Sequence, residues 1–251
     1  MSTIDSNHVN LLDWFAENTD NTRTLFSDLS QKWELDKYNP AMQSSLRYDD
    51  FASSEAIVLS YYNEVKAMLK SVTGAVDVLP FDFQVRRNDP SLAVNSRGAP
   101  GKAQPFSTVH GDQTANAAKR RLFHFHPEYA DRVWKPLRGP VSDFPLAVCD
   151  YRTVQDDDRV PCDIIFPDYL GETYNFWPNP QHRFYYIDGQ QSNEAWLVKC
   201  FDSATATNPN IAQFAPHVAF PYLSARPKIP RESIEVRTFV FYGDKQEAEA
   251  E

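Results

Sequence analysis

The sequence lacks features that mark several common protein classes. It has no run of about 18 apolar residues, the length that a membrane-spanning helix needs. Residues 1–10 also lack the basic segment and apolar run of a signal peptide. Motifs such as GxSxG, HExxH, GxGxxG and the phosphate-binding loop do not occur in a convincing context. We therefore expect a soluble cytoplasmic protein outside the common hydrolase and nucleotide-binding classes.

Cysteine and positive charge are also scarce. The three cysteines, Cys149, Cys162 and Cys200, show no CxxC spacing, which fits a reducing compartment and argues against a structural zinc site. The net charge of −9 argues against non-specific binding to nucleic acid. The expected partner is therefore a small molecule, with no nucleic acid and no membrane.

Aromatic residues, by contrast, are abundant, at 14% of a chain whose hydrophobic content is 42%. This composition predicts a folded protein, and 251 residues are enough to bury a substantial core. We expect a single domain over residues 1–251, with a polar amino-terminal arm at 1–50 and a solvated acidic tail at 243–251. The arm can pack onto its own domain or across a homodimer.

Two helices are predicted. Residues 53–71 carry apolar side chains at mixed three- and four-residue intervals without a proline, which indicates an amphipathic helix that Gly74 would end. A second helix is expected to start between Asp112 and Asn116 and to stop before Pro127.

Beyond the second helix, short apolar or aromatic runs are separated by Pro, Gly, Asp and Asn, which is typical of strands and turns. With a β-like segment at 76–86, they predict a mainly β protein with flanking helices, folded as a sandwich, a barrel or a double-stranded jelly roll. The expected strands are residues 133–137, 146–148, 163–166, 174–177, 183–187, 196–201, 217–222 and 233–242.

His110, Asp112 and His217 form a candidate metal site. Residues i and i+2 of a strand point to the same face, so His110 and Asp112 can bind one ion together, with His217 arriving from a distant strand. Two histidines and one carboxylate occupy one face of an octahedral ion and leave the other positions open, as oxygen-activating ferrous enzymes require. The pattern favours a non-haem iron oxygenase. The alternative for His217 is a core histidine bonded to a backbone carbonyl.

A candidate carboxylate receptor follows the distal histidine. Arg231 and Ser233 share one face if the segment from 231 to 242 is extended. A guanidinium and a hydroxyl together suit the distal carboxylate of a dicarboxylic co-substrate, because a planar bidentate pair fixes both charge and orientation. Arg237 lies on the same face and is the alternate. The competing interpretation is an exposed Arg231 paired with Glu232 or Glu235.

The substrate pocket is expected to be hydrophobic and partly aromatic. Its candidate residues can each also be core residues, and they are Trp134, Tyr174, Phe176, Tyr185, Phe214 and Phe220.

Several longer motifs occur in order along the chain: residues 134–150 (WKPLRGPVSDFPLAVCD), 171–173, 182–186, 199–203, 216–217 and 230–237. Together they resemble the signature of the fungal AsaB-type hydroxylase/desaturase family, whose members are gibberellin-desaturase-like relatives of non-haem iron/2-oxoglutarate oxygenases. The resemblance extends from about residue 49 to residue 242. Several long motifs in order are far more specific than the metal pair alone.

The resemblance implies a double-stranded β-helix, which is a cupin-like jelly roll, and the cofactors Fe(II) and 2-oxoglutarate. It also implies hydroxylation or desaturation of a small hydrophobic natural product in fungal secondary metabolism. His110, Asp112 and His217 fall on the iron positions of the family, and Arg231 with Ser233 on its 2-oxoglutarate position. The chain departs from the expected pattern at Gly111, between the proximal ligands, and at residues 211–214.

Two other hypotheses stay open at this point, because a fold does not fix chemistry. A redox-silent enzyme on the same fold could catalyse dehydration or a pericyclic step, such as a hetero-Diels–Alder cyclisation, without metal. His110, Asp112, Arg231 and Tyr185 would then serve as acid, base or hydrogen-bond donors. A non-catalytic binding module that keeps the jelly roll is the third hypothesis. Metal stoichiometry separates the iron enzyme from both.

Overall fold

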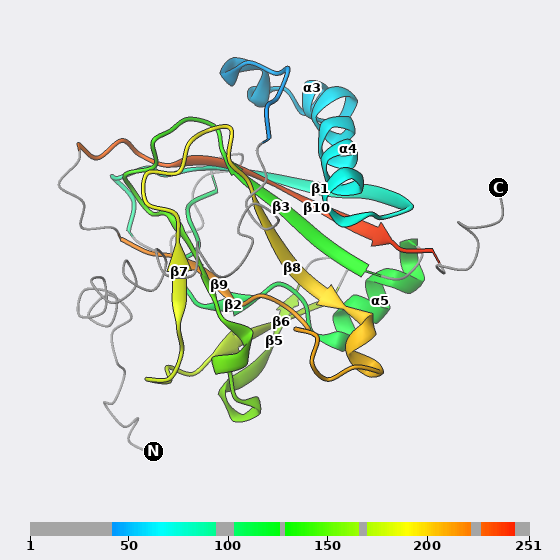
Figure 1. Ribbon diagram of the computed structural model, residues 1–251. Coiled ribbons are helices and arrows are strands. Elements are labelled where there is room, and N and C mark those ends of the chain that lie inside the picture. Colours follow the sequence, from blue (N-terminus) through cyan, green and yellow to red (C-terminus); the bar gives the residue numbers. More distant parts are fainter. Residues whose placement is uncertain (1–41, 94–102, 126–128, 166–169, 222–226, 244–251) are drawn as a thin grey trace.

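Two antiparallel β-sheets form the body of the protein in a computed structural model that describes residues 42–93, 103–125, 129–165, 170–221 and 227–243 (Figure 1). The four-stranded sheet has the order β1 (Asp77–Arg87), β10 (Glu232–Phe241), β3 (Tyr129–Pro136) and β8 (Trp196–Asp202). The six-stranded sheet has the order β5 (Arg159–Ile165), β6 (Leu170–Phe176), β2 (His110–Gly111), β9 (His217–Ala219), β4 (Leu146–Cys149) and β7 (Phe184–Tyr186).

The chain crosses repeatedly between the two sheets. β2, β4 and β9 belong to the six-stranded sheet, whereas β3, β8 and β10 belong to the four-stranded one. Such crossing is what the expected double-stranded β-helix requires, and the mainly β class with flanking helices is confirmed. Most of the expected arm at 1–50 and of the acidic tail at 243–251 lies outside the described residues.

The first predicted helix spans α3 (Ser54–Ala56), a π-helical turn η2 (Ile57–Tyr61) and α4 (Tyr62–Thr73). The Ser53 side chain caps its start by accepting a backbone N–H. Gly74 ends it in the left-handed conformation, with φ of 72°, which glycine adopts without a Cβ clash. None of the helices in the described part of the chain is long and apolar enough to cross a membrane.

The second predicted helix is α5 (Ala115–Phe125), which begins three residues after Asp112. Thr114 caps it, because its Oγ1 accepts a hydrogen bond from the Ala117 N–H at 3.1 Å. Within the described ranges, the other helical segments are short 3₁₀ turns, η1 (Tyr48–Ala52), η3 (Tyr151–Thr153), η4 (Asp156–Asp158) and η5 (Ser203–Ala206).

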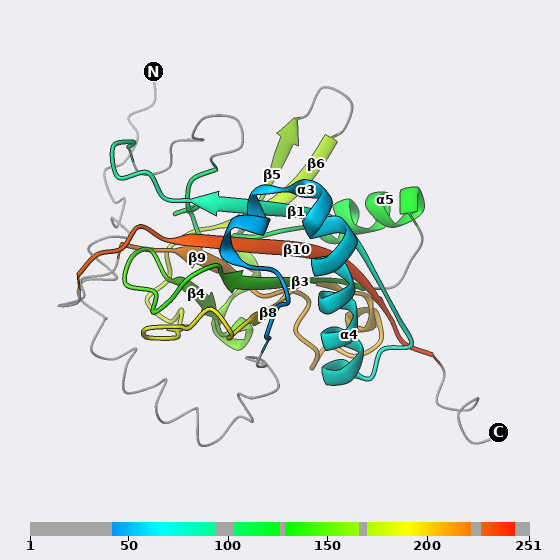
Figure 2. The same ribbon diagram turned by 90° about the horizontal axis from the view of Figure 1, so that it is seen from above.

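Helix α4 lies over the outer face of the four-stranded sheet (Figure 2). Its buried Val65 and Leu69 belong to an apolar cluster with side chains of that sheet, namely Val78, Val133, Ile234, Val236 and Val240. Full burial of one such side chain contributes about 1.5–3 kcal/mol, so this cluster is the main contact that fixes the helix on the sheet.

The inner face of the same sheet carries charged side chains. They alternate along the strand with the apolar side chains that face the helix. In β10, Ile234 and Val236 point to the helix, whereas Glu235 and Arg237 point between the sheets. Arg237 is paired across the strands with Arg132 of β3. Charged groups of β3 and β10 therefore meet in the space that the six-stranded sheet covers.

We predict that Gly139→Ala destabilises the loop after β3. A Cβ on residue 139 would lie 2.7 Å from the Gln190 carbonyl oxygen and 2.8 Å from the Gln191 Cα. Both are backbone atoms that cannot rotate away, so the free energy of unfolding should fall by about 1–3 kcal/mol. Urea unfolding of the variant measures this fall. An unchanged midpoint would show that the backbone at 190–191 moves aside at no cost.

Candidate metal centre and co-substrate site

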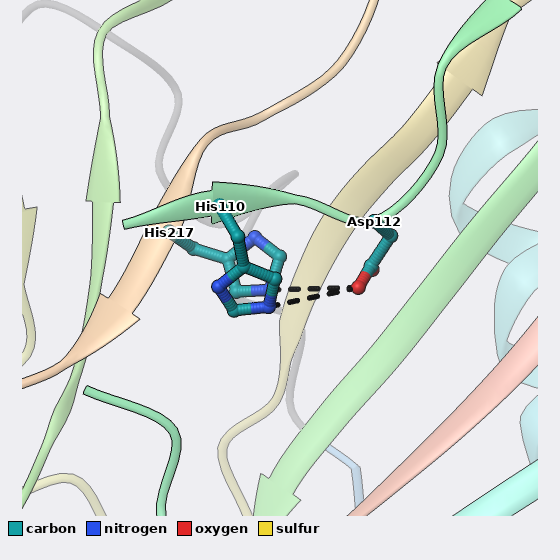
Figure 3. Close-up of side chains that lie close together, drawn as sticks. All are labelled: His110, Asp112 and His217. Carbon is teal, nitrogen blue, oxygen red and sulfur yellow. Dashed lines mark ion pairs between the residues drawn. The ribbon is translucent and has the colours of Figure 1, made fainter. Parts of the chain in front are cut away.

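The side chains of His110, Asp112 and His217 meet between the two sheets (Figure 3). His110 and His217 are directly paired across β2 and β9, so both project from the same face of the six-stranded sheet. His110 Nε2 lies 3.8 Å from Asp112 Oδ1, and His217 Nε2 lies 3.9 Å from the same oxygen. One ligand atom from each residue lies within 4.8 Å of the others. The structure thus brings the three predicted metal-ligand candidates together.

Hydrogen bonds fix the tautomer of both imidazoles. His110 Nδ1 lies 2.9 Å from the Thr108 carbonyl oxygen, and His217 Nδ1 lies 2.9 Å from the Ala215 carbonyl oxygen. A carbonyl only accepts, so each Nδ1 carries the hydrogen and each Nε2 presents a lone pair. Such backbone contacts orient metal-binding histidines in proteins.

The ionisation state of the site also suits a metal. Burial lowers the pKa of His110 to about 3, helped by the neighbouring His217, and burial lowers the pKa of His217 as well. Burial alone would raise the pKa of Asp112, but the positive charge of Arg132 and the electrostatic effects of His217, His110 and Arg237 together outweigh it and hold that pKa below its usual range. At neutral pH the site therefore offers two neutral imidazoles and one carboxylate, the forms that bind metal.

This donor set fits a ferrous ion. Two imidazole nitrogens and one carboxylate oxygen on one side of a cavity are the ligand types of non-haem iron oxygenases, and they leave coordination positions for other molecules. Both Nε2 atoms face the same oxygen of the Asp112 carboxylate (Figure 3).

Three neighbours of the site were not predicted: Arg132 in β3, Cys200 in β8 and Glu235 in β10. Arg132 forms a close ion pair with Asp112 Oδ1, and its Nη1 lies 3.1 Å from His217 Nε2. The Cys200 thiol donates to Asp112 Oδ2 at 3.1 Å. No sequence signal marked Arg132: it precedes the predicted strand at 133–137, and β3 contains two other charged residues, Asp131 and Lys135.

Arg231 and Ser233 form a buried polar pair at the start of β10, with 4% and 1% of their surface exposed. Arg231 Nη1 donates to the Phe144 carbonyl oxygen at 2.6 Å, and the guanidinium lies over the Trp134 ring, 5.4 Å from its centre. Among the described residues, neither Arg231 Nε nor Ser233 Oγ has a hydrogen-bond partner. Unpartnered buried donors of this kind are suited to an anionic ligand.

Glu232 and Glu235, the alternative carboxylate partners, form no ion pair with Arg231 in the described part of the chain. Glu232 pairs with Arg87 and Arg138. Burial lowers the pKa of Arg231 to about 9, helped by the positive charge of Arg86, and the negative charges of Glu235 and Asp143 offset only part of this effect. A bound carboxylate would relieve that cost.

Arg237, unlike Arg231, has carboxylate partners. It forms ion pairs with Asp82 and with Glu235, the latter at 3.1 Å. Its donors are therefore already satisfied by carboxylates of neighbouring strands, and it is less suited to receive a co-substrate than Arg231.

Two of the six predicted pocket residues lie on the metal-facing side. Trp134 is buried beneath Arg231. Tyr185 is paired with Val148, which is itself paired with His217, so Tyr185 shares the face of the histidines two strands away.

The other four predicted pocket residues point away from the metal candidates. Tyr174 is paired with Gly111, the residue that points opposite to His110. Phe214 packs on that outer side, where its ring lies 5.4 Å from Tyr174, and Phe176 lies beside it at 5.9 Å. Phe220 packs against Tyr186 in the outer apolar cluster. The alternation that turns the histidines inward turns these rings outward, so the expectation that they line the same pocket is corrected.

A cavity of about 280 Å³ opens next to the Arg231 region. Its lining includes Asp143 and Phe144, which contact the backbone and the side chain of Arg231. The cavity adjoins Arg231 through Pro230, Asp143 and Phe144, but neither Arg231, Ser233 nor any of the three metal-ligand candidates lines it.

A β-sandwich that presents two histidines and one carboxylate between its sheets defines a non-haem iron oxygenase. A family profile described as "Oxidoreductase/YMDC permease-like domain" matches residues 21–241. The Fe(II)/2-oxoglutarate-dependent dioxygenase nvfI of Aspergillus novofumigatus is 34% identical over 83% of this chain and 74% of its own length. The hydroxylase/desaturase asaB of Aspergillus flavus is 34% identical over 45% of this chain and 55% of its own length.

Solved structures agree with the sequence comparisons. The structure of the iron and alpha-ketoglutarate-dependent endoperoxidase NvfI matches with a TM-score of 0.70 and 28% identity, over 85% of this chain and 82% of that one. This chain belongs to that oxidoreductase family, which includes fungal iron- and 2-oxoglutarate-dependent dioxygenases and hydroxylase/desaturases. The resemblance to the AsaB-type family and the jelly-roll fold are thereby confirmed.

We predict that Gly111→Ala perturbs the metal site from its outer side. The new Cβ would lie 3.2 Å from a ring carbon of Phe214, which is buried and packed against Tyr174. Either the buried Phe214 ring or the backbone between His110 and Asp112 must give by a few tenths of an ångström, so stability should fall by about 1 kcal/mol or more. A double-mutant cycle with Phe214→Leu measures the coupling, and the smaller side chain should restore much of the loss. Full additivity of the two changes would contradict this contact as the cause.

Proposed function

We propose that this protein is an Fe(II)/2-oxoglutarate-dependent hydroxylase or desaturase of a small hydrophobic molecule in fungal secondary metabolism. His110, Asp112 and His217 would hold the iron, and Arg231 with Ser233 would receive the distal carboxylate of 2-oxoglutarate. The enzyme class and both cofactors follow from the relatives and the matched structure. The observation that supports the residue assignment is a set of three metal-binding atoms within 4.8 Å, in a site flanked by buried, unpartnered donors.

Each residue has a role that its contacts define. Thr108 and Ala215 hold the two imidazoles with Nε2 toward the site. Cys200 donates to Asp112 Oδ2, and Asp112 Oδ1, the oxygen that faces both Nε2 atoms, is paired with Arg132. Trp134 supports the guanidinium of Arg231 from one side, so that its free donors have a fixed direction.

Iron and 2-oxoglutarate, when bound, supply the oxidising power that removes hydrogen from the substrate. The chain contributes a dry environment for that chemistry. Leu146, Trp196 and Val198 are buried between the sheets beside Trp134 and keep bulk water from the site.

The partners, the location and the oligomeric state of the protein are also proposals. A small-molecule substrate follows from the enzyme relatives. The net charge of −9 supports a partner other than nucleic acid. The absence of a CxxC pair supports a reducing, cytoplasmic location, and a homodimer formed through the amino-terminal arm remains part of the proposal.

We predict that His217→Ala and His110→Ala abolish stoichiometric Fe(II) binding and oxidation of substrate. Each loses the only lone pair that its imidazole offers the site, whereas the apolar clusters around the sheets stay intact. Equilibrium metal binding and circular dichroism of each variant separate ligand loss from unfolding. Retention of one tightly bound Fe(II) in both variants would move the metal to other residues.

We predict that Arg231→Ala weakens 2-oxoglutarate binding by about 10- to 100-fold, the effect of losing one or two charge-assisted hydrogen bonds. Titration of the metal-loaded protein with 2-oxoglutarate measures the dissociation constant. Arg237→Ala is the comparison, since Arg237 is already paired with Asp82 and Glu235 and its loss should act on stability instead. A larger effect of Arg237→Ala on 2-oxoglutarate affinity would transfer the receptor to Arg237.

A further inference from the structure

The guanidinium of Arg132 reaches directly into the ligand set of the candidate metal centre. Its Nη2 pairs closely with Asp112 Oδ1, and its Nη1 lies 3.1 Å from His217 Nε2. Arg132 is 3% exposed, and it enters from β3 of the opposite sheet. A single side chain therefore contacts two of the three proposed ligands at the atoms that would bind iron.

The contact with His217 excludes a metal at the same nitrogen. Because His217 Nδ1 faces the Ala215 carbonyl, it carries the hydrogen, and Nε2 has one lone pair. That lone pair accepts a hydrogen bond from Arg132 or bonds to a metal, but it cannot do both.

Glu235 provides the alternative position for the guanidinium. Arg132 Nη1 already lies 3.2 Å from Glu235 Oε2, and this carboxylate is 3% exposed. Arg132 can therefore turn away from His217 and keep a buried carboxylate as its partner. The close pair with Asp112 is replaced by the charge of the incoming ion, so no buried carboxylate is left uncompensated.

We propose that Arg132 is an internal cation that holds the ligand set together in the metal-free protein and is displaced onto Glu235 when the metal binds. This inference rests on the proposed function, because it takes His110, Asp112 and His217 as the metal ligands. Binding of the metal ion then replaces the Arg132 guanidinium by another cation within a preformed site. The affinity for the metal is weakened by the free energy needed to displace Arg132, and the metal-free fold is stabilised by the same contact.

The test is titration of metal-free protein with Mn(II), with the free ion measured by electron paramagnetic resonance. Arg132→Leu removes the competing donor, and we expect it to bind Mn(II) about tenfold more tightly or better, on the scale by which neighbours of metal ligands act. Its metal-free form should melt at a lower temperature than the wild type, and saturating Mn(II) should raise its melting temperature by more.

Arg86→Gln is the matched control. Arg86 also pairs with Glu235, at 3.3 Å, but it has no contact with the three proposed ligands in the described structure. Its Mn(II) affinity should stay within about threefold of the wild type, which separates displacement at the ligand atoms from a general loss of positive charge.

A double variant, Arg132→Leu with Glu235→Gln, removes one charge of each sign and leaves the net charge of the site unchanged. It also removes one of the two buried carboxylates that Arg132 neutralises, in case the single variant fails to fold. We expect this variant to bind Mn(II) more tightly than the wild type.

The outcomes distinguish this inference from the proposed function. Equal or weaker Mn(II) binding by the Arg132 variants, with normal binding by the wild type, overturns the displacement and leaves Arg132 as a residue that orients Asp112. No binding by the wild type, or wild-type affinity in His217→Ala, overturns the metal site itself.

Discussion

The direct pairing of His110 with His217 across β2 and β9 is the constraint on which the site depends. Side chains paired across antiparallel strands share one face, so a single register places both imidazoles in the space between the sheets. A shift of one residue would turn one histidine into the outer apolar cluster. The same register fixes Asp112, which follows two residues after His110, and Tyr185, which lies two strands away on the same face.

Burial of charge between the sheets is the second constraint. Asp112, Arg132 and Glu235 are all buried to at least nine-tenths, and each is paired with an opposite charge. Removal of one partner from such a pair costs about 3–5 kcal/mol, since an uncompensated charge is left behind. In the proposed site, a metal ion would replace Arg132 without that loss, and Arg231, which has no carboxylate ion pair among the described residues, would bind the carboxylate of 2-oxoglutarate. The proposal therefore has the site take up a cation and an anion together.

The sequence predicted both helices, the three metal-ligand candidates and the approximate places of the strands, because periodicity and motif order are local properties. The strands β3, β5 and β6 each begin four residues earlier than predicted. It did not predict which aromatic rings face the metal. Tyr174 and Phe214 look like pocket residues in a strand pattern. Tyr174 is paired with Gly111, however, and Phe214 packs against the same residue, so both rings lie on the outer face of the sheet. Arg132 was missed for the same kind of reason: its partners come from β2, β9 and β10, and only the packing of two sheets brings them together. The preference for Arg231 over Arg237 as the carboxylate receptor, made from the Arg-x-Ser spacing alone, gains support from the ion pairs of Arg237.

The most direct test of the central claim is an anaerobic titration of the metal-free protein, first with one equivalent of Fe(II) and then with 2-oxoglutarate, followed by visible absorption. A charge-transfer band of the iron chelate reports that both cofactors occupy one site. We predict a band that saturates at one equivalent of 2-oxoglutarate and that is absent in His217→Ala. A folded wild-type protein that develops no band and retains no Fe(II) would contradict the assignment of His110, Asp112 and His217 as an iron centre.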